Sequence, residues 1–255
     1  MMTIHVFGRC FKDIFIYGEQ IHSSSIVETA GGSALNSSAG LSLLGFECLL
    51  HSACADDYNA RIIMDTLKVY SVNTRYLREN SAPSNLFVSR NGVALAAQIN
   101  EPSDFEDFDM DSQDSCLIFA TEMNEQHIDF ILEKPWNKVF IDLGPKYASK
   151  EFPHRLLKGI VIGNEFEAAS NKCGIIKLGK HGARWDDISV KGNGKELAFT
   201  TGAGDLFDVV FVFGYLQGFE PERILKDCVN YAQKACLIPG SSSKVEVLRE
   251  YNRFV

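Results

Sequence analysis

The chain has 255 residues, of which 45% are hydrophobic and 23% charged, and its formal net charge at pH 7 is −8. These values are typical of a globular protein that is long enough for one large α/β domain. The acidic balance argues against nucleic acid and against an anionic membrane surface as partners, because both require clustered Lys and Arg.

The cysteines and the first residues indicate where such a protein works. Seven cysteines are scattered along the chain without a Cys-x-x-Cys pair, so neither a disulfide framework nor a zinc site is indicated. The first six residues have the pattern of a strand and not of a basic, cleavable signal. The longest apolar run, residues 209–213, is too short to cross a bilayer. We therefore expect a soluble, cytoplasmic protein whose thiols are mostly buried.

The first expected element is a buried strand over residues 4–7. Asp13 follows this strand by a few residues. Because α/β folds place their ligands beyond the carboxyl ends of strands, Asp13 is a candidate binding residue. Residues 14–17 and 25–28 have the pattern of short strands that belong to an appendage.

Paired glycines precede a helix that is expected over residues 37–44. Gly31 and Gly32 would let a small polar ligand approach the backbone closely. Asn36, in the first turn of the helix, can both donate and accept hydrogen bonds. A simple helix cap explains the same residues, so the pattern alone leaves both interpretations open.

A hairpin interrupts the alternation of strands and helices. Extended segments at 86–89 and 93–99 are joined by Asn91-Gly92, a strong signal for a two-residue β-turn. A hairpin between βα units indicates an excursion from the main sheet.

From residue 116 onward strands and helices alternate. Strands are expected at 116–120, 138–142, 159–162 and 173–178. This alternation predicts a parallel sheet that is covered by helices on both faces. Helices at 221–236 and 244–253 end the chain, and no linker or repeat divides it, so we expect one domain over residues 1–255.

A glycine-rich turn, Gly202-Ala203-Gly204-Asp205, leads into an apolar helix predicted over residues 208–217. The glycines allow consecutive amides to point the same way, and the positive end of the helix reinforces them. Together they predict an anion site in which the Asp205 carboxylate can accept a proton from a hydroxyl. A plain strand-to-helix turn is the alternative interpretation.

Two other phosphate-binding patterns fit this chain poorly. Phe207 occupies the place of the third glycine of the dinucleotide fingerprint, and the turn lies near the C-terminus instead of in a first βαβ unit. A Gly-x4-Gly-Lys-Ser/Thr loop does not occur in the sequence. A dinucleotide-dependent oxidoreductase is therefore a weak alternative to a phosphotransferase.

Four motifs in order resemble the ribokinase-like (PfkB-type) carbohydrate kinase family. They are Gly31-Gly32-x3-Asn36, Asn164-x-x-Glu167, Leu178-Gly179-x-x-Gly182 and Thr201-Gly202-Ala203-Gly204-Asp205. The resemblance covers nearly the whole chain. It implies a three-layer α/β/α sandwich with a mostly parallel central sheet and a small β lid formed by segments near 14–30 and 76–99.

The resemblance also implies a reaction and its participants. The γ-phosphoryl group of ATP would be transferred, with Mg²⁺, to a primary hydroxyl of a sugar or nucleoside-like substrate. The catalytic base is matched by Asp205, and its anion hole by Gly202, Ala203 and Gly204. The substrate side is matched by Asp13, Gly31, Gly32 and Asn36, with Glu122 as a further candidate. The nucleotide side is matched by Asn164, Lys177, Gly179, Gly182 and Gln233, and the magnesium ion by Asn164 and Glu167.

The sequence departs from the family pattern at several positions. Phe199 stands where the family usually has an Asp that helps to bind a monovalent cation, so potassium activation of the usual kind is not expected. Ser33 replaces a common lysine, and Phe11 replaces an asparagine, which weakens the prediction of ribose as the substrate. Loops near the expected adenine site are short. A catalytically silent protein that binds a sugar or nucleotide as a sensor or scaffold is therefore the second hypothesis. Family analogy also suggests a homodimer formed through the lid.

Overall fold

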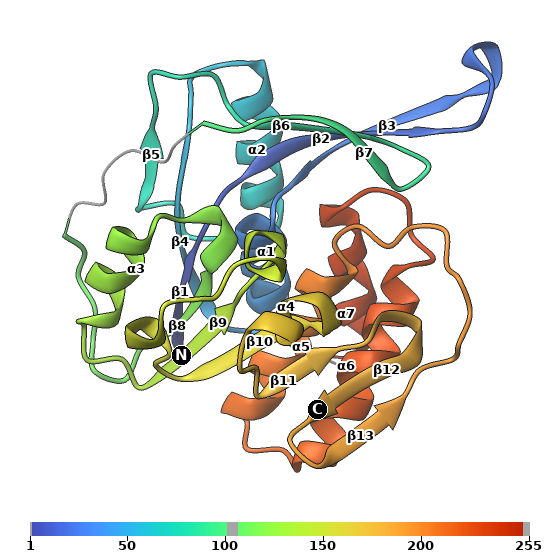
Figure 1. The fold of residues 1–255 in the computed structure, drawn as a ribbon. Coiled ribbons are helices and arrows are strands. Elements are labelled where there is room, and N and C mark those ends of the chain that lie inside the picture. Colours follow the sequence, from blue (N-terminus) through green and yellow to red (C-terminus); the bar gives the residue numbers. More distant parts are fainter. Residues whose placement is uncertain (1, 101–106, 252–255) are drawn as a thin grey trace.

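The computed structural model describes residues 2–100 and 107–251, and its described strands form two sheets (Figure 1). The larger sheet has nine strands in the order β13-β12-β11-β10-β9-β8-β1-β4-β5. Neighbouring strands from β5 to β11 are parallel, and β12 and β13 continue the sheet antiparallel. The bounds are β1 Thr3–Phe7, β4 Glu47–Cys54, β5 Leu77–Glu79, β8 Ser115–Phe119, β9 Lys138–Asp142, β10 Ile160–Asn164, β11 Ile175–Lys177, β12 Gly182–Trp185 and β13 Ile188–Lys191.

Helices cover both faces of this sheet, as the alternating side chains of its strands require. On β8, Leu117 and Phe119 belong to one buried apolar cluster, whereas Cys116 and Ile118 belong to a second. The first cluster lies beneath α1 Ser33–Leu43, α2 Tyr58–Val69, α5 Ala203–Leu216, α6 Pro221–Ala235 and α7 Leu248–Tyr251. The second lies beneath α3 Glu125–Leu132, and the short helix α4 Glu165–Ser170 lies on the same side, against β10. The predicted α/β/α architecture is therefore confirmed.

A smaller sheet lies across the top of the large one in Figure 1. Its strand order is β3-β2-β6-β7, with bounds β2 Phe11–Tyr17, β3 Ser25–Gly31, β6 Leu86–Arg90 and β7 Val93–Gln98. β6 and β7 are antiparallel, and the turn between them has positive φ at Asn91 (49°) and Gly92 (80°). The hairpin predicted from Asn91-Gly92 is confirmed, because both central residues of such a turn need positive φ.

The prediction that Asp13 lies in a loop past the first strand is wrong. β2 begins at Phe11, three residues earlier than predicted, and Asp13 lies inside it, paired with Thr29 and Phe87. Neighbours on both sides complete the hydrogen bonding of this segment. Local sequence could not show those partners, since they are 16 and 74 residues away.

Several other element boundaries also differ from the prediction. The helix predicted over 37–44 begins at Ser33, and the strand predicted over 25–28 extends to Gly31. The helix predicted from 208 begins at Ala203, because Gly202 adopts a left-handed conformation (φ 83°) that ends the preceding turn. The strand predicted over 173–178 is limited to Ile175–Lys177. The helix predicted over 244–253 is a 3₁₀ turn, Ser242–Val247, followed by α7, because Ser242, Lys244 and Val245 are drawn into the interior. Residues 252 and 253 lie outside the described part.

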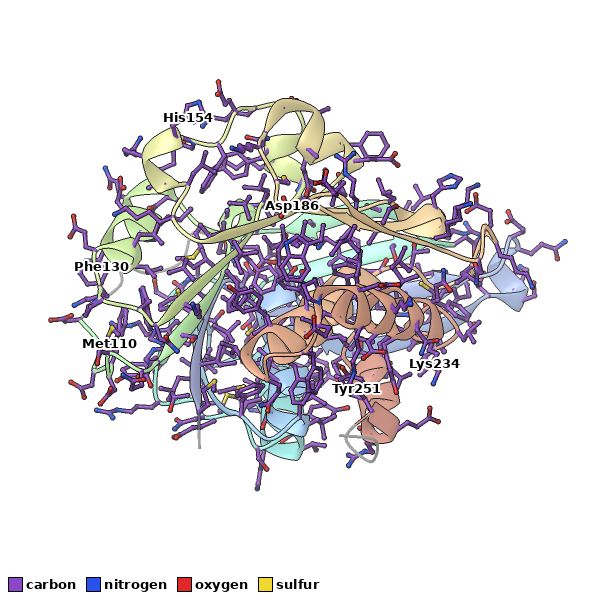
Figure 2. The ribbon with its side chains drawn as sticks, turned by 90° about the horizontal axis from the view of Figure 1, so that it is seen from below. Met110, Phe130, His154, Asp186, Lys234 and Tyr251 are labelled. Carbon is purple, nitrogen blue, oxygen red and sulfur yellow. The ribbon has the colours of Figure 1, made fainter. Side chains whose placement is uncertain are left out.

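Helix α5 is the centre of the molecule and carries the site at its N-terminus. It is apolar on nearly all sides and packs between the sheet, α1 and α6. Figure 2, which views the molecule from below, shows Lys234 of α6 and Tyr251 of α7 together, on the side away from His154. The Tyr251 ring contacts Phe213 of α5 and Tyr231 of α6, with centroids 5.5 and 4.8 Å apart. No helix within residues 2–100 and 107–251 is long and apolar enough to span a membrane. The thiols are free, and all but that of Cys173 are buried.

Candidate active site

The N-terminus of α5 presents backbone amides next to a carboxylate. The Ala203 amide donates to the Thr200 carbonyl (3.1 Å) and the Leu206 amide to Gly202 (3.2 Å). The amides of Gly204 and Asp205 donate to no acceptor in the described part of the chain. Of the predicted anion-hole residues, Ala203 therefore has its amide already engaged, whereas the next two amides remain open to an anion at the positive end of the helix.

A cavity of about 210 Å³ lies on one side of this helix start. It is lined by residues from β2, β6, α1, the turn after β8, the start of α5 and the loop after α6. Five of the predicted substrate and catalytic residues line it together: Asp13, Gly32, Asn36, Gly202 and Asp205. Glu122, the further candidate, also lines it. Ser241, which sequence reasoning missed, completes the polar wall.

Asn36 connects the carboxylate of Asp205 with Ser241. The Asn36 amide nitrogen donates to Asp205 Oδ2 (2.7 Å) and to Ser241 Oγ (3.0 Å). Gly31 does not line the cavity but lies directly behind it. A Cβ at Gly31 would come within 1.9 Å of Asp13 Oδ2 and 2.7 Å of Ser241 Oγ. Gly31 is thus required because Asp13 and Ser241 occupy the space of a side chain.

Three carboxylates face this cavity, and burial raises the pKa of each. The pKa of Asp13 is raised to about 7 by burial, against a hydrogen bond with Ser241 that lowers it. Burial also raises the pKa of Glu122 to about 7, although the Arg9 amide donates to its Oε2 (2.7 Å). The pKa of Asp205 is raised by burial, opposed by the hydrogen bond from Asn36 and by the charge of Lys177. A carboxylate with a raised pKa is a stronger base than an exposed one, which suits Asp205 to proton abstraction.

A second cavity, of about 400 Å³, lies on the other side of the start of α5. Four of the predicted nucleotide residues line it: Lys177, Gly179, Gly182 and Gln233. Lys180, His181 and Lys195 add further basic groups, against the acids Glu165 and Glu196. Gln233 Nε2 is buried and has no hydrogen-bond partner among the described residues, so it is available to an acceptor on a ligand.

Lys177 is held at the end of β11 by two acidic side chains. Its ammonium lies 2.6 Å from Asp142 Oδ2 and 3.1 Å from both carboxylate oxygens of Asp208. Burial lowers the pKa of Lys177, but the two carboxylates outweigh burial and raise it above its ordinary value. A Cβ on Gly204 would lie 3.7 Å from this ammonium. The Lys177 ammonium therefore lies beside the open amides, in an ion-pair cluster with two carboxylates.

Asn164 and Glu167 form a capping box at the start of α4 and line neither cavity. Glu167 Oε2 accepts from the Asn164 amide (2.8 Å), and Oε1 accepts from its side chain (2.7 Å). This arrangement explains both residues as a helix cap. Asn164 is nevertheless paired with Lys177 in the sheet, so the box lies next to the basic end of β11.

Among the described residues, no three His, Cys, Asp or Glu side chains lie close enough together to hold a metal ion by themselves. Mg²⁺ in phosphoryl-transfer sites is generally held by one or two carboxylates, by waters and by the phosphates themselves. The carboxylates of Glu167 and Asp142, near the second cavity, are a donor set of that type. Both oxygens of Glu167 already accept from Asn164, and Asp142 Oδ2 accepts from Lys177, so these carboxylates could reach a metal ion only through its waters.

Sequence reasoning also missed Asp142 and Asp208. Asp142 ends β9 and Asp208 lies in the second turn of α5, and neither belongs to a motif used in the sequence analysis. A signal was present in Asp208, because a charged residue inside an otherwise apolar helix needs a buried partner. The sequence could not identify that partner as Lys177, which is 31 residues away.

The fold is that of ribokinases, although no family model matches the chain. The deoxyribokinase of Salmonella typhi is 22% identical over an alignment of 302 residues, which covers 100% of this chain and 99% of the relative. The ribokinase of Arabidopsis thaliana, solved with ribose and ATP, has a TM-score of 0.79 at 18% identity and full coverage of both chains. The ribokinase of Cryptococcus neoformans, solved with ADP, has a TM-score of 0.76 at 19% identity, covering 98% of this chain and 100% of the other. The resemblance deduced from the four motifs is thus confirmed at the level of the fold.

Proposed function

We propose that this chain, with its ribokinase fold, is a kinase that transfers the γ-phosphoryl group of ATP to a hydroxyl of a sugar or nucleoside-like substrate. One observation carries the proposal. The start of α5 separates two cavities, with Thr201, Gly202 and Asp205 lining the acidic one and Thr200, Ala203 and Gly204 lining the basic one. A hydroxyl and a polyphosphate bound on the two sides would meet at the open amides.

The chemistry assigns a task to each group at this junction. Asp205 takes the proton of the acceptor hydroxyl, whose oxygen then bonds to the γ-phosphorus. The bond from that phosphorus to the leaving oxygen breaks, and the electron pair leaves with ADP. Charge on the transferred phosphoryl group would be stabilised by the Gly204 and Asp205 amides and by the Lys177 ammonium. In reactions of this type, such electrostatic stabilisation contributes more to the rate than proton abstraction does.

Nucleotide and magnesium would be held by the second cavity and the capping box beside it. Gly179, where a Cβ would meet no atom within 4 Å, leaves room for the nucleotide, and Gln233 offers its free amide to the base. Gly182 also lines the cavity, but a Cβ there would lie 1.9 Å from the Val190 carbonyl, so this glycine is required by the packing of β12 on β13. Asn164 and Glu167, with Asp142, would hold a magnesium ion through its waters. When bound, that ion would neutralise charge on the phosphates.

The first cavity favours an acceptor without negative charge. Asp13, Glu122 and Asp205 line it, and its lining, as far as the chain is described, includes no Lys, Arg or His. Three carboxyl groups around one small cavity accept hydrogen bonds from hydroxyl or amino groups, and they repel an anion when they are ionised. The substrate is therefore a neutral or amine-bearing polyol and does not already carry a phosphate.

The test is ADP release with Mg²⁺–ATP and a panel of sugars, amino sugars, nucleosides and phosphosugars. We expect turnover with one of the uncharged or amine-bearing acceptors. Asp205→Asn should reduce kcat by ~10²–10⁴-fold, the usual contribution of a positioned base. Its thermal midpoint should stay near that of the parent, which shows that the fold is intact.

Full activity of the Asp205→Asn protein would refute the mechanism. Binding of a polyol by calorimetry without any ADP release would favour the sensor or scaffold hypothesis instead.

We also propose a homodimer through the smaller sheet. β7 is an edge strand that is exposed along its whole length, including Val93 and Leu95 (65% and 57% exposed). Exposed apolar edge strands pair with other chains unless they are covered. Light scattering should give twice the chain mass, and Leu95→Lys should give a monomer. A monomeric parent at high concentration would contradict the proposal.

A further inference from the structure

Lys244 is a buried cation that is held by backbone carbonyls. Its side chain is 1% exposed, and its Nζ donates to the carbonyls of Phe199 (2.7 Å), Ala235 (2.8 Å) and Ile238 (2.5 Å). In the described part of the chain no carboxylate forms an ion pair with it. Buried lysines are usually paired with acids, so this arrangement needs an explanation.

Three converging carbonyl oxygens are the type of donor set that binds a monovalent cation. One oxygen comes from Phe199 and two come from the segment 235–238, and a further contact joins these two segments. The Phe199 amide donates to the Cys236 carbonyl (3.2 Å), and Ala235 lies at the C-terminus of α6, where the helix dipole adds negative potential. The Lys244 ammonium has three N–H groups and satisfies one carbonyl with each. A separate ion at this point would compete with it for the same three oxygens.

The three carbonyls around the Lys244 ammonium form a carbonyl cage. This cage lies directly beneath the anion-binding turn, Gly202 to Asp205. A Cβ on Gly202 would be 3.5 Å from Lys244 Cδ and 3.5 Å from Ser241 Oγ. Phe199 precedes that turn by three residues, and Ile238 precedes Ser241 by the same number. Through these two carbonyls Lys244 holds together the start of α5 and the loop that supplies Ser241 to the first cavity.

We propose that Lys244 is a built-in substitute for a monovalent cation and positions the anion-binding turn without added potassium. This assignment explains why the family's cation-binding Asp can be replaced by Phe199, since its carbonyl here receives the ammonium. Lys244 is a positioning residue because it touches neither cavity. The role in activity depends on the proposed kinase function, but the cation site itself does not.

The experiment measures thermal midpoints of the full chain in sodium, potassium or alkylammonium chlorides at equal ionic strength. The wild-type midpoint should be the same in sodium and potassium. Lys244→Ala removes the equivalent of a propylammonium ion, so its lowered midpoint should rise by about 2 °C or more with propylammonium and not with tetramethylammonium. Lys244→Val ends at Cγ and leaves the ammonium position open, so potassium or ammonium should stabilise it. Propylammonium should not, because its chain would need the space of that Cγ.

Lys226→Ala is the matched control, because Lys226 pairs with Glu222 on the surface of α6 and should show no cation response in either direction. Where the proposed kinase activity is present, the same additives should restore activity to the Lys244 variants. A wild-type protein that gains stability from potassium over sodium would overturn the proposal, as would Lys244 variants that respond to neither type of cation. If both variants fail to fold, the wild-type midpoints in sodium and potassium still test the proposal. Because thermal midpoints do not require catalysis, the test also holds if the protein is not a kinase.

Discussion

The two cavities on either side of α5 differ in charge although they share one helix N-terminus. The first is small and lined by Asp13, Glu122 and Asp205, whereas the second is about twice as large and lined by three lysines and a histidine as well as two glutamates. An acidic wall selects a hydroxyl-bearing ligand without negative charge, and a basic wall selects a polyanion. This difference indicates that the charge of each cavity determines which of the two substrates it binds, and that specific hydrogen bonds then orient the bound substrate.

The largest effect is expected when the fixed charge of the basic cavity is removed. Lys177→Met leaves Asp142 and Asp208 buried without their cation, which should cost about 3–5 kcal/mol of unfolding free energy. Urea unfolding followed by circular dichroism measures it. Lys180→Met, on the same cavity but paired with the exposed Glu196, should cost less than about 1 kcal/mol. Equal losses of unfolding free energy in the two variants would show that the buried ion pairs of Lys177 with Asp142 and Asp208 contribute no more than a surface pair.

The acidic cavity should make stability fall as the pH rises. The folded-state pKa of Asp13 is about 7, above its ordinary 3.8, so its protonated form is favoured in the folded protein. The stabilisation is complete below about pH 4 and is lost as the pH rises through 7, at up to about 1.4 kcal/mol per pH unit. The unfolding free energy of Asp13→Asn minus that of the parent should increase from pH 5 to 7.5. The opposing titration of the buried His5 and His51, whose pKa values burial lowers, cancels in this difference. Asp57→Asn is the control, because the pKa of Asp57 is lowered and does not titrate in this window. A free-energy difference between Asp13→Asn and the parent that stays constant or decreases from pH 5 to 7.5 would contradict the prediction.

The charge of the acidic cavity should also decide which acceptors bind. We expect a phosphosugar to bind at least roughly tenfold more weakly than the parent sugar, because Coulomb repulsion at partly buried sites amounts to several kcal/mol. At pH 8, above the pKa of about 7 of Asp13 and Glu122, Glu122→Gln should narrow the difference in affinity, since it removes a carboxylate that is ionised there. Competition calorimetry with matched sugar and phosphosugar pairs measures the ratio. Preference for the phosphosugar would mean that the cavity is not the acceptor site.

The smallest effect is expected from the free amide in the basic cavity. Gln233→Leu removes a buried donor that has no protein partner, so the loss should appear on binding ATP, at about 1 kcal/mol or roughly fivefold in KM. The KM of the acceptor should be unchanged, because Gln233 lines only the second cavity. A change in the acceptor KM alone would place Gln233 outside the nucleotide site.

The sequence by itself determined the order of strands and helices, the hairpin at Asn91-Gly92 and the glycine-rich turn before α5. These features depend on neighbours in the chain: the periodicity of apolar residues and the φ angles that glycine and asparagine permit. The residues of the four motifs were also identified from the sequence. Where those residues meet was inferred from resemblance alone.

Only the tertiary structure decided the charge pairing and the fine geometry of the site. The bonds from Lys177 to Asp142 and Asp208, the contact of Asn36 with Ser241, and the carbonyl cage around Lys244 join segments that are distant in sequence, apart from two cage carbonyls near Lys244. Distant segments also determine the position of Asp13, which was predicted in a loop but lies in β2, paired with Thr29 and Phe87. A buried polar group must find its partner wherever the packed chain brings one within hydrogen-bond distance. A polar residue in an apolar segment shows that a partner is needed, but only the fold determines which residue is that partner.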